Sequence, residues 1–554
     1  MLEATVNYKT EFNKSNLDVV VGYAFQDFRT FGFNSAARGF SSTDLETMAG
    51  DLVSTVNAAE ASISGSFQQF FFAPNRPDVT VNRLFPDPET TNQPFDFSTD
   101  VRAVVFDNFD NTDELQSFFA RANYSIDNKY LFTGTLRADG SSRFGPENSY
   151  GFFPSGAFAW QLAEEDFVGD NISTLKLRLS GGVTGNQDGL GFGQFVARQR
   201  FSGLGLGSIS NGGTIDNANG LAIIATDQPD LRWEETTDFN VGLDFGFNND
   251  KFNGSLDFYR RDTEDILLQT PPAAPSTNPF QFGNVDANVI NQGVELALNY
   301  NFIETEDTTF SASFNISYND NEIENFAGSI NLGPINGPGL TGAFAQRFEA
   351  GQSLFSYFIA TFTGFDADGN PTYLDIDGNG VGDPDVDRSF VGEDALPDVT
   401  SGLSLNLSHK NWDFSTFFSG QFGFSVYNNT ANPLFNAGHL NTARNITVDA
   451  ANAGENSSAS TAVSTRFLED GDFVRLQNAT IGYNVPIKDK TTFKSLRLSL
   501  TGQNLFLITD YSGIDPEVTV NTGALNAAAL PSRGIDFSAF PNPLTITFGL
   551  NARF

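Results

Sequence analysis

One acidic stretch holds the residues best suited to chemistry, and that chemistry is cation binding. It reads Asp-Ile-Asp-Gly-Asn-Gly from Asp375 to Gly380 and continues through Asp383 and Asp387. Calcium loops place oxygen ligands at alternate positions before a tight glycine turn, and Gly380 stands at the sixth position of this pattern. The twelfth position carries Val386 in place of a bidentate glutamate, so Asp383 or Asp387 has to supply that ligand.

The acidic stretch therefore predicts a weak Ca²⁺ site, and no other cofactor is expected. Extracellular calcium sites with dissociation constants of roughly 0.1–1 mM still fill where calcium is millimolar. The alternative is an acidic Asp/Gly turn in an outer loop that binds no metal. The candidate ligands are Asp375, Asp377, Asn379, Asp383 and Asp387.

A second group of candidates is aromatic and lies in two segments that we expect to be outer loops. Aromatic faces stack on sugar rings, and apolar pockets bind peptide side chains, so these residues are candidates for contact with substrate. Phenylalanine lacks the polar group of Trp or Tyr, which weakens the carbohydrate interpretation. The alternative is packing of the loops on each other or on a lid partner. The residues are Phe67, Phe70, Phe71, Phe72, Phe280 and Phe282.

Two arginines form a third group. Arg143 lies in Gly-Ser-Ser-Arg-Phe-Gly, and Arg475 lies in Phe-Val-Arg-Leu-Gln-Asn. Inside a polar lumen such arginines pair with carboxylates, and we expect Glu234 or Glu235 to be partners. Direct contact with substrate is the alternative.

Catalysis finds little support, and we predict no enzyme. Carboxylate pairs such as Glu164–Glu165 occur, but no spacing separates an acid from a base. The chain has no cysteine and only two histidines, His409 and His439, which disfavours zinc sites and histidine relays. Residues 185–187 lack the sequence of a phosphate loop. A formal net charge of −36 disfavours nucleic acid as a partner.

The elements that must position these residues are strands. From Leu544 to Phe554 every second side chain is apolar, and a period of two gives a strand one apolar and one polar face. About ten residues let a tilted strand cross a bilayer. The alternation recurs along the chain, and no apolar run of about 18 residues indicates a membrane helix. The expected fold class is all-β, an antiparallel transmembrane β-barrel with about fifteen strands in this chain.

Short and long connections alternate between these strands. Outer-membrane barrels have short periplasmic turns and long extracellular loops, so the alternation predicts which end of the barrel faces outward. The short turns are expected at residues 13–15, 127–128, 248–250, 304–308, 408–411 and 486–494. The long extracellular loops are expected near residues 28–115, 185–231, 263–289, 321–398, 425–471 and 507–542.

Seven segments resemble the SusC/RagA family of TonB-dependent outer-membrane transporters, in the order found in that family. Together they extend over most of the chain. They are NYSIDNKYLFTGTLRADGSSRFG at 123–145, GFFPSGAFAWQLAEEDF at 151–167, LKLRLSGGVTGNQ at 175–187, LRWEETTDFNVGLDFG at 231–246, YLDIDGNGVGDPDVDR at 373–388, GDFVRLQNATIGYNVP at 471–486 and GQNLFLITDYSGIDPEV at 502–518.

The resemblance implies a barrel of about 22 strands, of which residues 1–554 supply strands 8 to 22. The family's signal peptide, amino-terminal extension, TonB-contacting segment and plug domain have no counterpart here, so we expect a truncated fragment. By resemblance, the complete protein imports oligosaccharides or peptides. It draws energy from TonB-ExbB-ExbD, and a SusD-like surface lipoprotein closes over its outer loops.

Two other functions remain open from the sequence. One is a passive porin-like channel, or a structural half-barrel of a split transporter. The other is a soluble secreted β-protein such as an adhesin. Bilayer conductance distinguishes the channel from the importer, and membrane fractionation distinguishes both from the secreted protein.

Overall fold

Fifteen antiparallel strands form one continuous wall, which confirms the predicted fold class. The structure is a computed structural model of residues 1–554. It describes all of them except 62–68, 74–75, 83–100, 197, 203–207, 210–214, 217–219, 226, 271–280, 334, 336–339, 341–342, 443, 459–460, 488–492 and 519–530. The wall strands are β1 (Leu2–Phe12), β2 (Ser15–Arg38), β5 (Ala103–Ile126), β6 (Tyr130–Ser141), β7 (Tyr150–Gln161), β8 (Ile172–Asn186), β13 (Glu234–Phe247), β14 (Phe252–Glu264), β17 (Asn288–Glu304), β18 (Thr308–Glu324), β25 (Val399–His409), β26 (Trp412–Phe422), β29 (Phe473–Asn484), β30 (Ser495–Thr509) and β32 (Thr545–Arg553).

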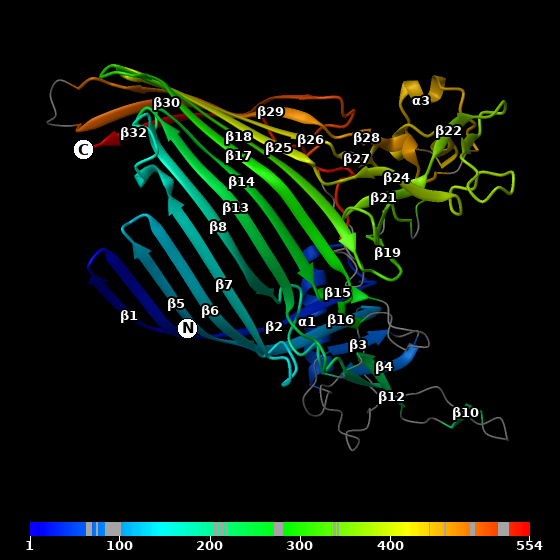
Figure 1. Ribbon diagram of the computed structural model, residues 1–554. Helices are drawn as coiled ribbons and strands as arrows, with labels where there is room; N and C mark the ends of the chain where they lie inside the picture. Colours follow the sequence, from blue (N-terminus) through cyan, green and yellow to red (C-terminus); the bar gives the residue numbers. More distant parts are fainter. Residues whose placement is uncertain are drawn as a thin grey trace.

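Each wall strand pairs with the wall strand that follows it in the chain, from β1–β2 to β30–β32. The wall curves about a common axis, and its two edge strands, β1 and β32, are separate (Figure 1). Within the described residues no pairing joins β1 to β32. The wall is therefore an open sheet rather than a closed ring.

The two faces of the wall differ in polarity. On the outer face Phe258, Val294 and Tyr318 lie side by side on β14, β17 and β18, and all three side chains are exposed. On the opposite face Arg178 of β8 donates hydrogen bonds to Asp244 of β13 at 2.8 Å and Asp257 of β14 at 2.9 Å. An apolar exterior with a polar interior is the arrangement that a membrane barrel requires.

The short connections lie where the alternation predicts them, all at one end of the wall (Figure 1). Their backbones adopt the left-handed conformation at Asn13, Asp127, Asn128, Asn248 and Lys410, with φ between 52° and 58°. Asn and Asp tolerate this conformation better than other residues with a Cβ, and the turns use them for that reason.

One long connection is shorter than predicted. The sequence predicts a loop near 28–115, but β2 continues to Arg38 and β5 already begins at Ala103. The two strands pair over their whole lengths and form a ribbon beyond the wall. Helix α1 (Leu45–Glu60) contacts this ribbon, and β3 (Gln69–Ala73), β4 (Arg76–Asn82), β9 (Arg198–Ser202) and β12 (Gly220–Ala225) extend the sheet from β5.

The other five long connections begin and end within a few residues of the predicted bounds. Among them, residues 187–233 contain β10 (Ser208–Ile209) and β11 (Ile215–Asp216), and residues 265–287 contain β15 (Ile266–Thr270) and β16 (Gln281–Val285). At the opposite end of the wall, where the short turns lie, the connection between β7 and β8 contains the 3-10 helix η1 (Leu162–Glu164).

The described parts of residues 325–398, 423–472 and 510–544 gather at the loop end of the wall, and we call them the loop domain (Figure 1). Its elements are β19 (Ser329–Leu332), β20 (Gln346–Glu349), β21 (Ser356–Ala360), β22 (Phe362–Phe365), β23 (Pro371–Tyr373), β24 (Arg388–Asp394), β27 (Ser425–Asn428), α2 (Ala431–Leu434), η2 (Ala437–Thr442), α3 (Val448–Asn452), η3 (Thr465–Phe467), β28 (Leu468–Asp470) and β31 (Ile535–Asp536).

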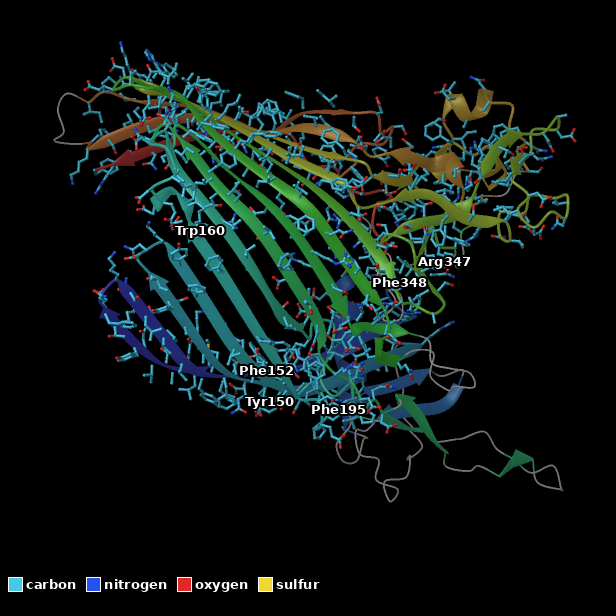
Figure 2. All side chains as sticks on the ribbon, in the orientation of Figure 1. Tyr150, Phe152, Trp160, Phe195, Arg347 and Phe348 are labelled. Carbon is cyan, nitrogen blue, oxygen red and sulfur yellow. The ribbon has the colours of Figure 1, made fainter. Side chains whose placement is uncertain are left out.

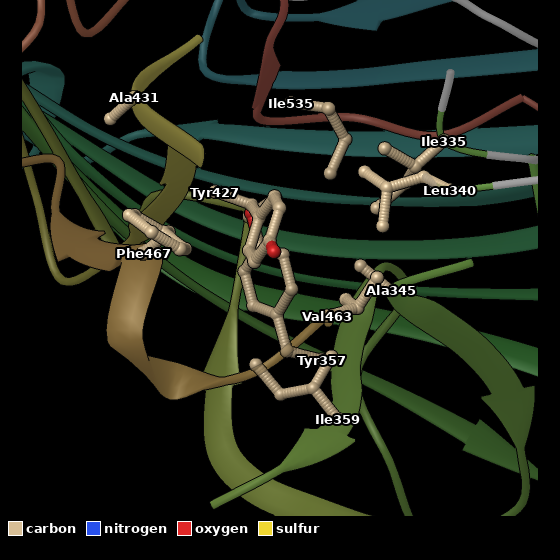
Figure 3. Packing of buried hydrophobic residues seen from close by; sticks show 11 residues of the cluster. Ile335, Leu340, Ala345, Tyr357, Ile359, Tyr427, Ala431, Val463, Phe467 and Ile535 are labelled. Atoms are coloured by element: carbon tan, nitrogen blue, oxygen red, sulfur yellow. The ribbon is translucent and has the colours of Figure 1, made fainter. Parts of the chain in front are cut away.

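A hydrophobic core joins the three segments of the loop domain. Tyr357, Tyr427 and Ile535 come from different segments, are almost completely buried and pack together (Figure 3). The Tyr357 hydroxyl lies 3.0 Å from the carbonyl oxygen of Ser425 and 2.9 Å from that of Gly534. The core therefore holds three distant loops in one arrangement.

Helices contribute little to the architecture. None of those described is both long enough and apolar enough to cross a membrane.

Candidate functional site

The acidic stretch forms a compact loop between β23 and β24, organised by its own carboxylates. Asp375 accepts hydrogen bonds from the backbone N–H groups of Gly378 at 2.8 Å and Gly380 at 2.7 Å. Gly378 and Gly380 have φ values of 76° and 91°, where a Cβ would be strained. The glycines thus let the chain fold back over Asp375.

Asp387 closes the loop from its far end. Its side chain is only 1% exposed and accepts hydrogen bonds from the backbone N–H groups of Ile376 at 2.9 Å, Asp377 at 3.1 Å and Asp383 at 2.8 Å. These donors hold the pKa of Asp387 below its ordinary value, against the opposing effect of burial. Asp387 is therefore an anion at neutral pH.

Three of the five predicted calcium ligands come together. Oxygen atoms of Asp375, Asp377 and Asp387 lie within 4.8 Å of one another. Asp383 is outside this group, and its carboxylate accepts a hydrogen bond from the Asp385 N–H at 2.9 Å. The Asn379 side-chain oxygen accepts one from the Val381 N–H at 2.8 Å. Ca²⁺ binding here stays a prediction.

The aromatic candidates divide into two groups. Phe67 and Phe280 lie outside the described residues, and so do the side chains of Phe70, Phe71 and Phe72, whose backbone forms part of β3. Phe282 is half-buried in β16 and packs on a cluster that contains Phe144, Phe153, Leu190, Leu231, Trp233 and Leu267. For Phe282 the structure favours packing between loops over contact with substrate.

Both predicted arginines make ion pairs, but with other partners than expected. Arg143 pairs with Asp113 at 3.1 Å, and Arg475 pairs with Asp515 at 2.5 Å and with Glu517 at 3.0 Å. Arg475 and Asp515 are both nearly fully buried.

Glu234 has other partners: its carboxylate accepts hydrogen bonds from the Asn186 side chain at 2.8 Å and the Leu267 N–H at 3.0 Å. The prediction that both arginines pair with carboxylates is confirmed, but the example partners Glu234 and Glu235 are not the ones used. The carboxylates that pair with Arg143 and Arg475 come instead from β5 and from the segment after β30.

The Glu164–Glu165 pair also has a structural explanation. Glu165 accepts hydrogen bonds from Lys129, Tyr130 and Trp160, each between 3.0 and 3.1 Å, at the short-turn end of the wall (Figure 2). It links the β5–β6 turn to the end of β7 and has the surroundings of a structural carboxylate.

One site escaped the sequence analysis. A cavity of about 500 Å³ in the loop domain is lined by Phe344, Arg347, Phe358 and Arg388, and Figure 2 shows Arg347 at the loop end of the wall. Arg347 and Arg388 are the only Lys, Arg or His residues in the sequence from 325 to 398, which is the one signal that the sequence offers. No linear pattern shows that they meet.

The antiparallel wall, with its apolar outer face and polar inner face, has the architecture of a membrane β-barrel protein. Residues 2–505 match the family described as TonB dependent receptor-like, beta-barrel. The chain belongs to this family, and the protein is an outer-membrane protein.

Two curated relatives are each 33% identical to this chain. TonB-dependent receptor P3 of Formosa agariphila matches over 478 residues, which are 80% of this chain and 46% of that protein. TonB-dependent receptor SusC of Bacteroides thetaiotaomicron matches over 462 residues, 79% of this chain and 44% of that protein. The chain thus covers less than half the length of these relatives, which are named as receptors and not as enzymes.

A solved structure shares the fold. The structure of the RagAB peptide transporter superposes with a TM-score of 0.70, covers 99% of this chain and 55% of the other, and is 24% identical in sequence. At this identity the likeness supports the fold alone.

Proposed function

We propose that the protein to which these 554 residues belong is a TonB-dependent importer of oligosaccharides or peptides in the outer membrane. The observation that carries the proposal is the wall of fifteen strands with its long loops gathered into a folded domain at one end. A wall supplies the path across the membrane, and folded loops supply surfaces that select a solute. The relatives named as TonB-dependent receptors support the energy source.

The proposed partners are TonB-ExbB-ExbD on the periplasmic side and a SusD-like lipoprotein on the loop side. The basis for the lipoprotein partner is the resemblance to the SusC/RagA family together with the SusC relative, which is 33% identical. Exposed apolar side chains on the loop domain, such as Val381, Val386 and Val448, suit contact with a lid.

The test is uptake. Cells that express the full-length protein with its neighbouring lipoprotein are grown on a panel of oligosaccharides and peptides, with and without TonB. TonB-dependent growth on one substrate supports the proposal, and growth that is independent of TonB on every substrate contradicts it.

We also propose that residues 1–554 alone do not carry out energised uptake. In the part of the chain that the structure describes, strands β1 and β32 each pair on one side only, and unpaired backbone groups cannot face lipid. Further strands, from the same protein or from another chain, have to close the wall. TonB-dependent uptake by cells expressing only these residues would contradict this.

The unpaired edges favour one second candidate, a half-barrel of a split transporter or a passive channel. Conductance through planar bilayers distinguishes a passive channel from a gated importer. Steady current from the purified protein without TonB supports the passive channel, whereas an electrically silent protein supports the gated importer.

A further inference from the structure

The cavity of about 500 Å³ in the loop domain brings two cations, Arg347 and Arg388, together with the carboxylate of Asp385, the Thr461 side chain and several apolar side chains. Arg347 and Arg388 line it together with the rings of Phe344 and Phe358 and the aliphatic side chains of Leu340 and Val463. Its volume lies within the range of small-molecule sites, roughly 300–1,000 Å³. Two guanidinium groups in one cavity are unusual in a chain with 67 acidic and 31 basic residues.

Arg347 is held in place by a ring and one hydrogen bond, and its terminal nitrogens make only one long ion pair. Its guanidinium lies 3.5 Å from the centre of the Phe358 ring, and Phe390 packs edge-on against that ring at 5.1 Å. Its Nε donates to the Asn331 side chain at 3.1 Å. Among the described residues neither terminal nitrogen makes a hydrogen bond, and the Glu349 carboxylate is 3.8 Å away. Stacking on a ring leaves the in-plane donors of Arg347 free for a ligand.

Arg388 supplies a second, fully engaged positive charge. Its Nε donates to the Pro384 carbonyl at 2.8 Å, one terminal nitrogen pairs with Asp385 at 2.9 Å, and the group lies 4.9 Å from the Phe344 ring. Arg388 thus lines the cavity as a structural cation, whereas the terminal nitrogens of Arg347 can donate hydrogen bonds to a ligand.

The charge of Arg347 is compensated in part, by the Glu349 carboxylate at 3.8 Å. Burial lowers its pKa, the carboxylate of Glu349 partly opposes this, and the charge of Arg388 adds to the lowering. A bound anion would relieve this repulsion and satisfy the free donors at the same time.

We propose that this cavity binds a carboxylate-bearing part of the imported solute, with Arg347 forming two parallel hydrogen bonds to the carboxylate. The planar fork of arginine matches a planar carboxylate, and the Phe and aliphatic walls match a sugar face or a peptide side chain. The proposal rests on the proposed import function and adds an acidic substrate class to it. The carboxylate comes either from a uronic acid or from the carboxyl terminus of a peptide.

The test measures binding to the full-length protein in detergent by calorimetry, with two matched pairs of probes. One pair is a uronate disaccharide and its methyl ester, and the other is a tetrapeptide and its carboxyl-terminal amide. We expect the acid of one pair to bind roughly 10- to 100-fold tighter than its neutral partner, which is the range for hydrogen bonds to a charged group. The pair that shows the difference identifies the source of the carboxylate.

Variants assign this difference to the cavity. Arg347→Gln is expected to abolish it, and Arg347→Lys to retain only part, because lysine keeps the charge but lacks the fork. Arg29→Gln is the control, since Arg29 also carries one charge and stacks on a ring, Phe31, but lies exposed on the β2–β5 ribbon. Unchanged proteolysis patterns confirm that the variants are folded.

Two results would overturn the proposal. One is equal binding of acid and neutral probe in both pairs, and the other is an undiminished difference in Arg347→Gln. Uptake of the same probes is measured separately. Uptake without an acid preference contradicts only this inference, whereas an Arg347-dependent acid preference without TonB-dependent uptake contradicts only the proposed function.

Discussion

At the scale of the single residue, the Asp387 side chain organises the acidic loop. This one buried carboxylate accepts hydrogen bonds from three backbone N–H groups, which belong to residues 4 to 11 positions earlier in the chain. A carboxylate with a lowered folded pKa stabilises the fold above its unfolded pKa, and this contribution is lost as the pH falls through the folded value. The loop should therefore loosen in acid.

Asp387→Asn tests this role. At pH 7 we expect faster amide hydrogen exchange at Ile376, Asp377 and Asp383 than in the natural protein, because the neutral amide is a weaker acceptor. The difference should persist at the ordinary aspartate pKa and disappear only as the pH falls through the lowered pKa of folded Asp387, where the natural carboxylate becomes neutral too. Equal exchange at pH 7 would contradict the assigned role.

The Ca²⁺ prediction is also decided by single residues. Calorimetric titration of the natural protein should give a dissociation constant of roughly 0.1–1 mM, the range of extracellular sites. Asp375→Asn should weaken binding about tenfold or more, because one charged ligand is lost. Asp368→Asn is the matched control, since Asp368 lies in the same segment but outside the carboxylate group. No heat of binding in the natural protein would contradict the prediction.

At the scale of the single element, each wall strand has one apolar and one polar face. Leu256 and Ser255 are neighbours on β14, and Leu256 points to the exposed apolar face between Leu243 and Leu296. Leu256→Lys should destabilise the wall by about 2–4 kcal/mol, the cost of a cation facing lipid at the middle of a bilayer. Ser255→Lys should cost much less, because position 255 lies across from Asp244 on the polar face.

The measurement for this pair is the midpoint of urea unfolding of the full-length protein in lipid vesicles. Equal midpoints for the two lysine variants would show that the two faces of the wall are not distinguished by lipid.

The loop domain depends on one close approach of backbone. Gly534 has a φ of 63°, and a Cβ there would lie 2.7 Å from the Ala395 Cβ and 2.9 Å from the Tyr357 hydroxyl. Gly534→Ala should destabilise the domain by about 1–3 kcal/mol beyond the cost of the backbone conformation. Gly392→Ala is the control, since Gly392 has a φ of 81° and no neighbour within 4 Å of an added Cβ.

Limited proteolysis of the loop domain measures this difference. Faster cleavage in Gly534→Ala than in Gly392→Ala is the expected result, and equal cleavage would show that the core of Tyr357 and Tyr427 does not hold the three segments together.

At the scale of the whole molecule, the open wall and the folded loop domain pose different requirements. The loop domain has its own buried core and already joins three distant segments. The wall has two edges that need further strands before it can lie in lipid. This is why we propose that energised import needs more of the protein than residues 1–554.

The wall and the acidic loop could be predicted from the sequence in some detail, and the arginine cavity of the loop domain could not. Ile546, Phe548 and Leu550 alternate with polar residues in the chain and lie exposed on β32, because lipid imposes the polarity of each face. Beyond the bilayer this constraint ends. Phe28 and Phe31 fall on opposite faces of β2, and the predicted loop began near residue 28, although the strand continues to Arg38.

Ion pairing of Arg143 and Arg475 was expected, but Asp113 and Asp515 lie 30 and 40 residues from them and no pattern names them.

Sequence alone determined the strands, their turns and the acidic loop. The alternation of side chains in a strand, the apolar face that lipid requires and the turn residues that tolerate a left-handed backbone each involve only a few neighbouring positions. Only the tertiary structure decided which loops share a core and which side chains meet across them. Tyr357 meets Gly534, and Arg347 meets Phe358 beside Arg388, because the folded wall gathers its long connections at one end. Contacts between segments so far apart depend on the register of the whole sheet, which no local pattern records.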